Sequence, residues 1–104
     1  MIVSLVRFKS GLSDDEVQAR FEERATLYRS VPGLVEKIYV RFRESGEFGV
    51  VYLWDSQKAL MDFRETELAR TIPDEYQVVE GPHAELADVC LVVQPDASRS
   101  AVLP

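Results

Sequence analysis

The sequence FGVVYLW at positions 48–54 decides the fold. It is an almost unbroken run of β-branched and aromatic residues, which is typical of a central strand buried on both faces. Successive side chains of a strand point to opposite faces, so the side chains at 48, 50, 52 and 54 share one face, and Val51 and Leu53 share the other. Both faces of the predicted sheet are therefore apolar, and each needs a covering layer.

The residues before this run predict an antiparallel partner strand. The sequence ESGE at 44–47 has the composition of a hairpin turn, and positions 34–42 alternate between two faces as a strand does. One face is apolar and consists of Leu34, Ile38, Val40 and Phe42. The other face mixes charge with an aromatic ring and consists of Val35, Lys37, Tyr39 and Arg41.

A strand and a helix are predicted further upstream. Residues 2–9 are rich in β-branched and aromatic types, as in a first strand. Ser13 and Glu16 have the spacing of a capping box, which marks a helix start. Pro32-Gly33 ends this helix. Its apolar residues recur at helical spacing and are Val17, Phe21, Ala25, Leu27, Tyr28 and Val31.

Downstream, Asp55 or Ser56 can cap a second helix that runs to about Arg64. Its apolar face consists of Ala59, Leu60 and Phe63. Positions 65–81 carry a weak signal, compatible with a short further helix and a brief edge segment at 76–79. The apolar stretch 83–93 predicts the last strand, in which Cys90 is a buried core residue.

This β-α-β-β-α-β order predicts an α+β domain with a ferredoxin-like fold over residues 1–93. In that fold, two right-handed crossovers leave both helices on one face of a four-stranded antiparallel sheet. From position 94 the composition changes to Pro, Asp, Ser, Arg and Ala, which predicts a flexible C-terminal tail over 94–104.

The second apolar face of the sheet predicts a homodimer. Helices cover one face only, so the other face must meet water or another layer. If the same face of a second copy covers it, two sheets close into a dimeric α/β barrel. The alternative is a monomer with a broad exposed apolar patch, which monomers seldom tolerate.

Composition excludes several classes of function. The net charge of −6, without a concentrated basic region, argues against nucleic-acid binding. No apolar run approaches the roughly 20 residues that cross a bilayer, and the apolar N-terminus lacks the features of a secretory signal. A single cysteine excludes an internal disulfide. We therefore expect a cytoplasmic protein with no membrane partner.

The residues alone suggest a small-molecule site more clearly than a metal site. Lys37, Tyr39 and Arg41 on one strand face could bind and polarise an anionic or phenolic ligand, or could form a solvated rim. Tyr52 and Trp54 could give flat walls to an aromatic ligand, or could be core. One histidine, His83, with scattered carboxylates predicts no metal site.

Arg7 interrupts an apolar strand and needs a partner if it is buried. Asp88 poses the same problem with the opposite charge in the last strand, so we expect the two to pair across the sheet. In that case both residues are structural.

Positions 31–34 (VPGL), Lys37, Tyr39 and the run from 49 to 56 (GVVYLWDS) together resemble the YdhR-type monooxygenases. Those proteins belong to the dimeric α/β-barrel superfamily, with the antibiotic-biosynthesis monooxygenases. The resemblance implies a homodimer with a pocket between sheet and helices in each subunit. It also implies oxidation of phenolic, polycyclic substrates by dioxygen without metal or flavin, because an electron-rich phenolate can itself react with oxygen.

The resemblance implies Lys37, Tyr39 and Tyr52 as catalytic residues and Trp54 as a substrate-binding residue. Arg7, Phe63 and Tyr28 complete the predicted substrate-binding set. Haem-degrading relatives carry an asparagine on the first strand and a tryptophan and a histidine on the second helix. This chain has Arg7, Phe63 and no histidine there, which argues against a haem cofactor.

The leading hypothesis is a cofactor-independent monooxygenase that acts on a small aromatic or polyketide-like phenol. A second hypothesis keeps the pocket but makes the reaction a cyclisation or isomerisation, which the same acid-base groups could support. A third is a non-catalytic dimer that only binds a small hydrophobic molecule.

Overall fold

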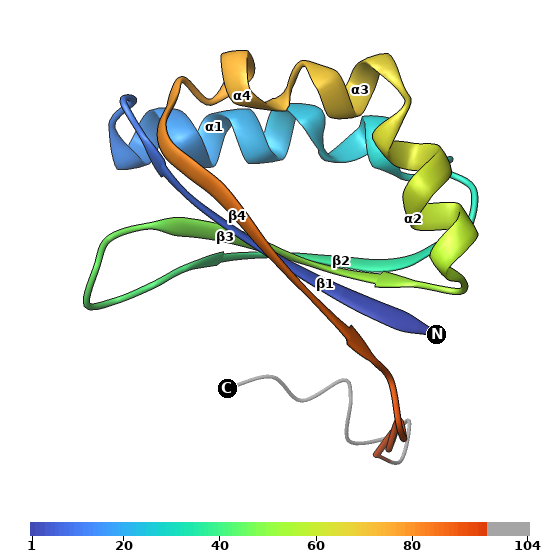
Figure 1. Ribbon diagram of the computed structural model, residues 1–104. Coiled ribbons are helices and arrows are strands. Elements are labelled where there is room, and N and C mark those ends of the chain that lie inside the picture. Colours follow the sequence, from blue (N-terminus) through green and yellow to red (C-terminus); the bar gives the residue numbers. More distant parts are fainter. Residues whose placement is uncertain (96–104) are drawn as a thin grey trace.

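The computed structural model describes residues 1–95, and its element order is β-α-β-β-α-β with short helical pieces added. The elements are β1 (Ile2–Ser10), α1 (Asp14–Ala25), the 3-10 turn η1 (Thr26–Tyr28), β2 (Leu34–Arg41), β3 (Phe48–Trp54), α2 (Gln57–Arg64), α3 (Glu67–Arg70), α4 (Ile72–Glu75) and β4 (Val78–Asp88). Figure 1 shows all the helices on one side of a twisted sheet. The other side of the sheet has no covering element among these residues.

The sheet confirms the predicted ferredoxin-like fold. Its strand order is β2-β3-β1-β4, and every neighbouring pair is antiparallel. β3 lies between β2 and β1, as its two-sided apolarity predicted. Its helix-facing side chains are all buried: Phe48, Val50, Tyr52 and Trp54.

One face of the sheet, here called the open face, remains partly exposed and mainly apolar. By strand register it comprises Val3, Leu5, Arg7, Glu36, Ile38, Val40, Gly49, Val51, Leu53, His83, Glu85 and Ala87. A register shift between Leu34 and Glu36 changes the predicted pattern of β2. Leu34 lies opposite Trp54 and packs against the helix-side core instead of sharing a face with Ile38.

Helix α1 begins with the predicted capping box. The Ser13 Oγ accepts from the Glu16 amide at 3.2 Å, and the Glu16 carboxylate accepts from the Ser13 amide at 3.1 Å. These bonds lower the pKa of Glu16. The helix ends earlier than predicted, and η1 turns Leu27 outward, where it is 52% exposed.

The weak signal of positions 65–81 has a structural counterpart. After α2, which Ser56 caps as predicted, the chain forms two four-residue helices, α3 and α4, before it enters β4. We call residues 65–77 the roof, because this segment lies over the helix-side face of the sheet (Figure 1). No helix in residues 1–95 is long and apolar enough to cross a membrane.

The last strand is displaced from its predicted range. It occupies Val78–Asp88 instead of 83–93 because it pairs with β1, whose first residue, Ile2, lies opposite Asp88. After Asp88, one more backbone hydrogen bond joins the described residues to the N-terminal segment: the Val89 amide donates to the Met1 carbonyl at 3.1 Å. The prediction that Cys90 is buried is therefore wrong, and the thiol is exposed. The predicted tail over 94–104 lies almost wholly outside the described residues.

Candidate functional site

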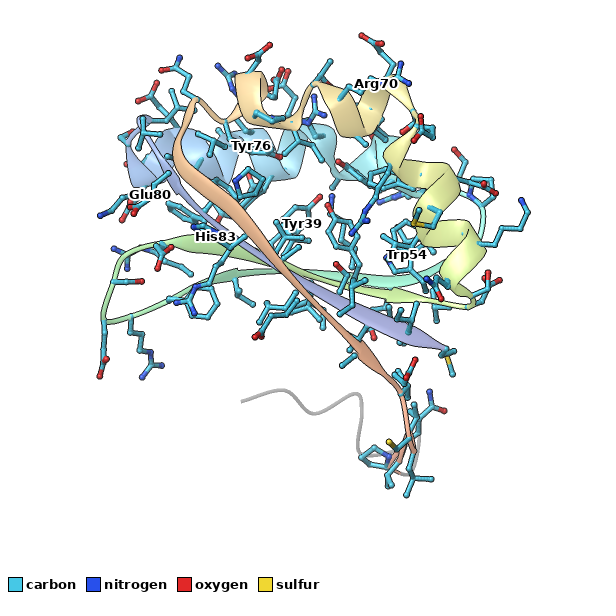
Figure 2. All side chains as sticks on the ribbon, in the orientation of Figure 1. Tyr39, Trp54, Arg70, Tyr76, Glu80 and His83 are labelled. Atoms are coloured by element: carbon cyan, nitrogen blue, oxygen red, sulfur yellow. The ribbon has the colours of Figure 1, made fainter. Side chains whose placement is uncertain are left out.

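A cavity of about 220 Å³ lies between the sheet and the helices. β3 forms its floor with Val50, Tyr52 and Trp54, and the roof contributes Ala69, Ile72, Pro73 and Tyr76. Figure 2 shows Tyr39, Trp54 and Tyr76 between the two layers. The remaining lining residues come from β1, β2, β4, η1 and α2: Ser4, Val6, Phe8, Tyr28, Lys37, Tyr39, Leu60, Phe63, Arg64, Val78, Pro82 and Ala84.

Lys37 is the only lysine that lines this cavity, and three tyrosine rings surround its amine. The Nζ lies 2.8 Å from the ring centre of Tyr28, 4.6 Å from that of Tyr39 and 5.0 Å from that of Tyr52. We call this arrangement the tyrosine cage. Among residues 1–95, no carboxylate lies within ion-pair distance (4.0 Å) of Lys37, although Lys9 and Lys58 each have one.

The fold explains how the cage forms. Lys37 and Tyr52 are directly opposite each other on β2 and β3, and Tyr39 is two residues along the same face of β2. Tyr28 comes from η1, which turns its ring toward the sheet. The cage therefore combines two neighbouring strands with the end of the first helical segment.

Burial changes the acid-base properties of every member of the cage. Desolvation, followed by the charge of Arg24, lowers the pKa of Lys37 to about 6. Desolvation also raises the pKa of Tyr39 to about 12 and raises those of Tyr28 and Tyr52. The ring faces oppose the shift at Lys37, because they stabilise an ammonium ion. Near neutral pH the site thus holds neutral phenols beside an amine that can accept a proton.

Two buried polar atoms in the cavity wall lack hydrogen-bond partners within the described part of the chain. They are the Tyr39 hydroxyl and the indole Nε1 of Trp54. A buried donor without a partner costs about 1–3 kcal/mol, so such groups are rare unless a ligand or water satisfies them. Both atoms therefore suit an oxygen-bearing ligand.

Arg24 is a functional candidate that the sequence analysis missed. Its side chain is buried, and its Nη2 donates to the Leu68 carbonyl and the Thr71 hydroxyl, each at 3.4 Å. Its Nη1 lies 3.6 Å from the Glu75 carboxylate. The spacing of Phe21, Arg24 and Tyr28 follows the buried helix stripe and could have indicated this position.

Tyr76 is a second missed residue. It ends α4 and is buried, with its ring centre 5.3 Å from that of Phe21 and 5.6 Å from that of Phe8. Burial raises the pKa of its hydroxyl. The sequence offered no signal for this placement, because the short roof helices carry little periodicity.

The cavity brings together six of the seven predicted site residues: Lys37, Tyr39, Tyr52, Trp54, Phe63 and Tyr28. Arg7 is not among them. It lies on the open face, 3.4 Å from the Glu47 carboxylate and 3.8 Å above the Phe42 ring. Its expected pairing with Asp88 is also wrong, because the register places Asp88 opposite Ile2, five positions from Arg7.

The cavity does not fit a haem or a metal ion. No group of three His, Cys, Asp or Glu side chains converges within residues 1–95. The lining contains no histidine, cysteine or methionine, which are common axial ligands of haem iron. Tyrosinate can also ligate iron, but the raised pKa values of the lining tyrosines oppose its formation.

The sequence matches no protein-family model and no curated protein. Solved structures do match, and they are antibiotic biosynthesis monooxygenase-like proteins. SnoaB from Streptomyces nogalater, a cofactor-independent oxygenase, is 14% identical with a TM-score of 0.72, over 90% of this chain and 97% of that one.

Two further structures have the same fold. A Caulobacter crescentus protein, provisionally named an antibiotic biosynthesis monooxygenase, is 20% identical with a TM-score of 0.73, over 86% of this chain and 90% of its own. A mutant of MhuD with two manganese protoporphyrin IX molecules per active site is 19% identical with a TM-score of 0.73, over 91% of this chain and 100% of that one. At these identities the likeness establishes the fold.

Proposed function

We propose that this chain is a cofactor-independent monooxygenase that oxidises a small phenolic, polyketide-like substrate within the cavity. The observation that carries the proposal is the tyrosine cage, in which Lys37 lies among neutral phenols and no carboxylate of residues 1–95 is within 4.0 Å of its amine. The apolar wall and the likeness in fold to SnoaB support the same reading.

Lys37 is the proposed general base. Because its pKa is about 6, much of the amine is unprotonated near neutral pH and can accept the proton of a bound phenol. The resulting ammonium stabilises the phenolate by charge, and the cage rings stabilise the ammonium in turn. Tyr39 and Tyr52 remain protonated and can donate hydrogen bonds to the anionic oxygen.

The electrons for oxygen reduction come from the substrate. A phenolate in conjugation with a methylene carbon gives electrons to dioxygen, and a carbon-oxygen bond forms to give a hydroperoxide. Loss of water leaves a ketone at that carbon. One oxygen atom enters the product, the other leaves as water with the two hydrogens of the methylene, and no external reductant is needed. The protein binds the substrate, favours its deprotonation and excludes water.

A panel of anthrone-type and hydroquinone substrates would test this proposal by oxygen uptake. Lys37→Met should reduce uptake by about 10²-fold or more, the usual effect of removing a general base. Lys58→Met is the matched control, because Lys58 is exposed and pairs with Asp62. Oxygen uptake that is absent across the panel, or equal in the two variants, would contradict the proposal.

Anaerobic incubation separates the alternatives. Product formed without oxygen would support a cyclase or isomerase. Binding without any product would support a ligand-binding protein, for which Lys37→Met, Tyr39→Phe and Tyr52→Phe change affinity only.

We also propose that the working form is a homodimer in which a second copy covers the open face. Val51 and Leu53 of β3 and Ile38 of β2 belong to that face, and Ile38 is 46% exposed. Leu91 and Val93, beyond the end of β4, are 80% and 78% exposed. Both groups of apolar side chains would gain from burial against a partner.

A further inference from the structure

The chain has three lysines, and their environments differ sharply. The Lys58 amine is exposed and lies 2.6 Å from the Asp62 carboxylate, and the Lys9 amine is half-exposed and lies 3.9 Å from Glu80. Lys37 lines an apolar cavity inside the tyrosine cage. Lys37 is therefore the lysine whose charged form loses the most hydration, with no carboxylate of residues 1–95 within 4.0 Å to offset that loss.

We propose that Lys37 is also a nucleophile that forms an imine with small aromatic aldehydes entering the cavity. The Nζ lone pair forms a bond to the carbonyl carbon and gives a carbinolamine. Loss of water then leaves a carbon-nitrogen double bond where the carbon-oxygen double bond had been. The step needs neither oxidant nor reductant, and it extends beyond the proposed oxidation.

The lining residues favour this class of ligand. Tyr28, Tyr52, Trp54 and Phe63 present aromatic rings to a space of about 220 Å³, which suits a compact aromatic compound. The Tyr39 ring centre lies 4.6 Å from the amine, and its hydroxyl has no hydrogen-bond partner among the described residues, so a carbonyl oxygen that reaches it can accept its proton in a hydrogen bond. The cage tyrosines keep their protons near neutral pH, so they can assist the departure of water.

Nearby charges and burial give Lys37 and Lys58 different pKa values. Burial and the charge of Arg24 lower the pKa of Lys37 to about 6. The Asp62 carboxylate raises the pKa of Lys58. At neutral pH, Lys37 therefore has a much larger fraction of the unprotonated amine than Lys58 has.

Reductive trapping tests the inference on the intact chain. The protein is incubated near pH 7 with benzaldehyde and cyanoborohydride, which reduces an imine to a stable secondary amine, and the labelled lysines are located by peptide mass spectrometry. We expect Lys37 to be labelled about tenfold or more faster than Lys9 and Lys58. In denaturant the preference should disappear, because it depends on the folded cavity.

Two lysine variants test whether the fast adduct forms at Lys37. Lys37→Arg should remove the fast adduct, and Lys58→Arg should retain it. Equal labelling of the three lysines in the folded wild type, or no label at Lys37, would overturn the inference even if Lys37→Arg failed to fold. Oxygen uptake is measured separately: uptake that depends on Lys37 without an adduct would overturn the imine alone, and an adduct at Lys37 without uptake would overturn the oxidation alone.

Discussion

Lys37 of β2 and Tyr52 of β3 are cross-strand neighbours, and the lysine amine lies 5.0 Å from the centre of the tyrosine ring. Both side chains point away from the open face and toward the helices. A basic residue on the covered side of a sheet is costly unless it has a partner. Here the cost is reduced by neutral aromatic rings instead of a carboxylate, and this arrangement governs two of the predictions below.

The stability of the protein should depend on pH through Lys37. Its folded pKa of about 6 is below its ordinary value of 10.5, so between these values the unfolded chain binds a proton that the native chain does not. Stability from this group therefore rises with pH across that window, and the penalty is full below it. Lys37→Met should flatten the slope and stabilise the fold by roughly 1–3 kcal/mol near pH 6. Urea unfolding near pH 6 and near pH 9 measures this, and parallel shifts at both values would contradict it.

Oxygen uptake should depend on the same ionisation. Below the pKa of about 6, Lys37 is protonated and cannot act as a base. The rate under saturating substrate should therefore rise through that region and level off above it. The Lys58→Met control should keep the same midpoint. A rate that falls as the pH rises through this range would rule out Lys37 as the base.

Adding a single methyl group at Gly33 should destabilise the fold. Its φ is +78°, and an added Cβ would collide with the Cβ of Ala59 and come within 2.8 Å of the Asp55 carboxylate. We expect Gly33→Ala to destabilise the fold by roughly 2–4 kcal/mol. Gly46→Ala is the matched control, because Gly46 has a φ of +72° with nothing within 4 Å of the added atom. It should cost only about 1–2 kcal/mol, and equal losses in chemical denaturation would contradict a steric contribution at Gly33.

Arg24 should hold the roof over the cavity. Arg24→Met removes two hydrogen bonds to the roof and the ion pair with Glu75, so amide hydrogen exchange in residues 67–76 should accelerate. The expected loss of stability is about 1–3 kcal/mol. Arg20→Met is the control, because its more exposed side chain contacts only Glu75 within the roof, at 3.7 Å. Unchanged exchange in the Arg24 variant would show that packing alone holds the roof.

A charge on the open face should prevent dimer formation. Ile38→Asp places a carboxylate within the proposed interface on the open face, and light scattering should then report half the wild-type mass. Leu27→Asp changes an equally exposed apolar residue on the helix side and should leave the dimer intact. A wild type that is monomeric at micromolar concentration would contradict the dimer itself.

Local sequence predicted those features that depend on local rules. The alternation in 48–54 located the central strand, and the Ser13–Glu16 spacing located the start of α1. The alternation in 34–42 placed Lys37 and Tyr39 on one face, although it could not say that this face would be the covered one. Of the nineteen residues that line the cavity, the predicted site set included six.

The missed features depend on distant parts of the chain. β4 ends at Asp88 because β1 begins at Ile2, which the apolar run around Cys90 cannot reveal. The register shift near Val35 depends on how β2 pairs with β3. Arg24 was overlooked because a charged side chain was not expected on a buried stripe, and its role depends on carbonyl and hydroxyl groups more than 40 positions away.

The roof is built from two four-residue helices, whereas the amine and its facing phenol are fixed on paired strands. Insertions or exchanges in the roof would alter the dimensions of the chamber without disturbing the strand pairing beneath it. Related chains could thus diverge in the molecules they accept while keeping one reactive centre. Because the paired strands can stay constant while the roof changes, this small domain is suited to acquiring new substrates.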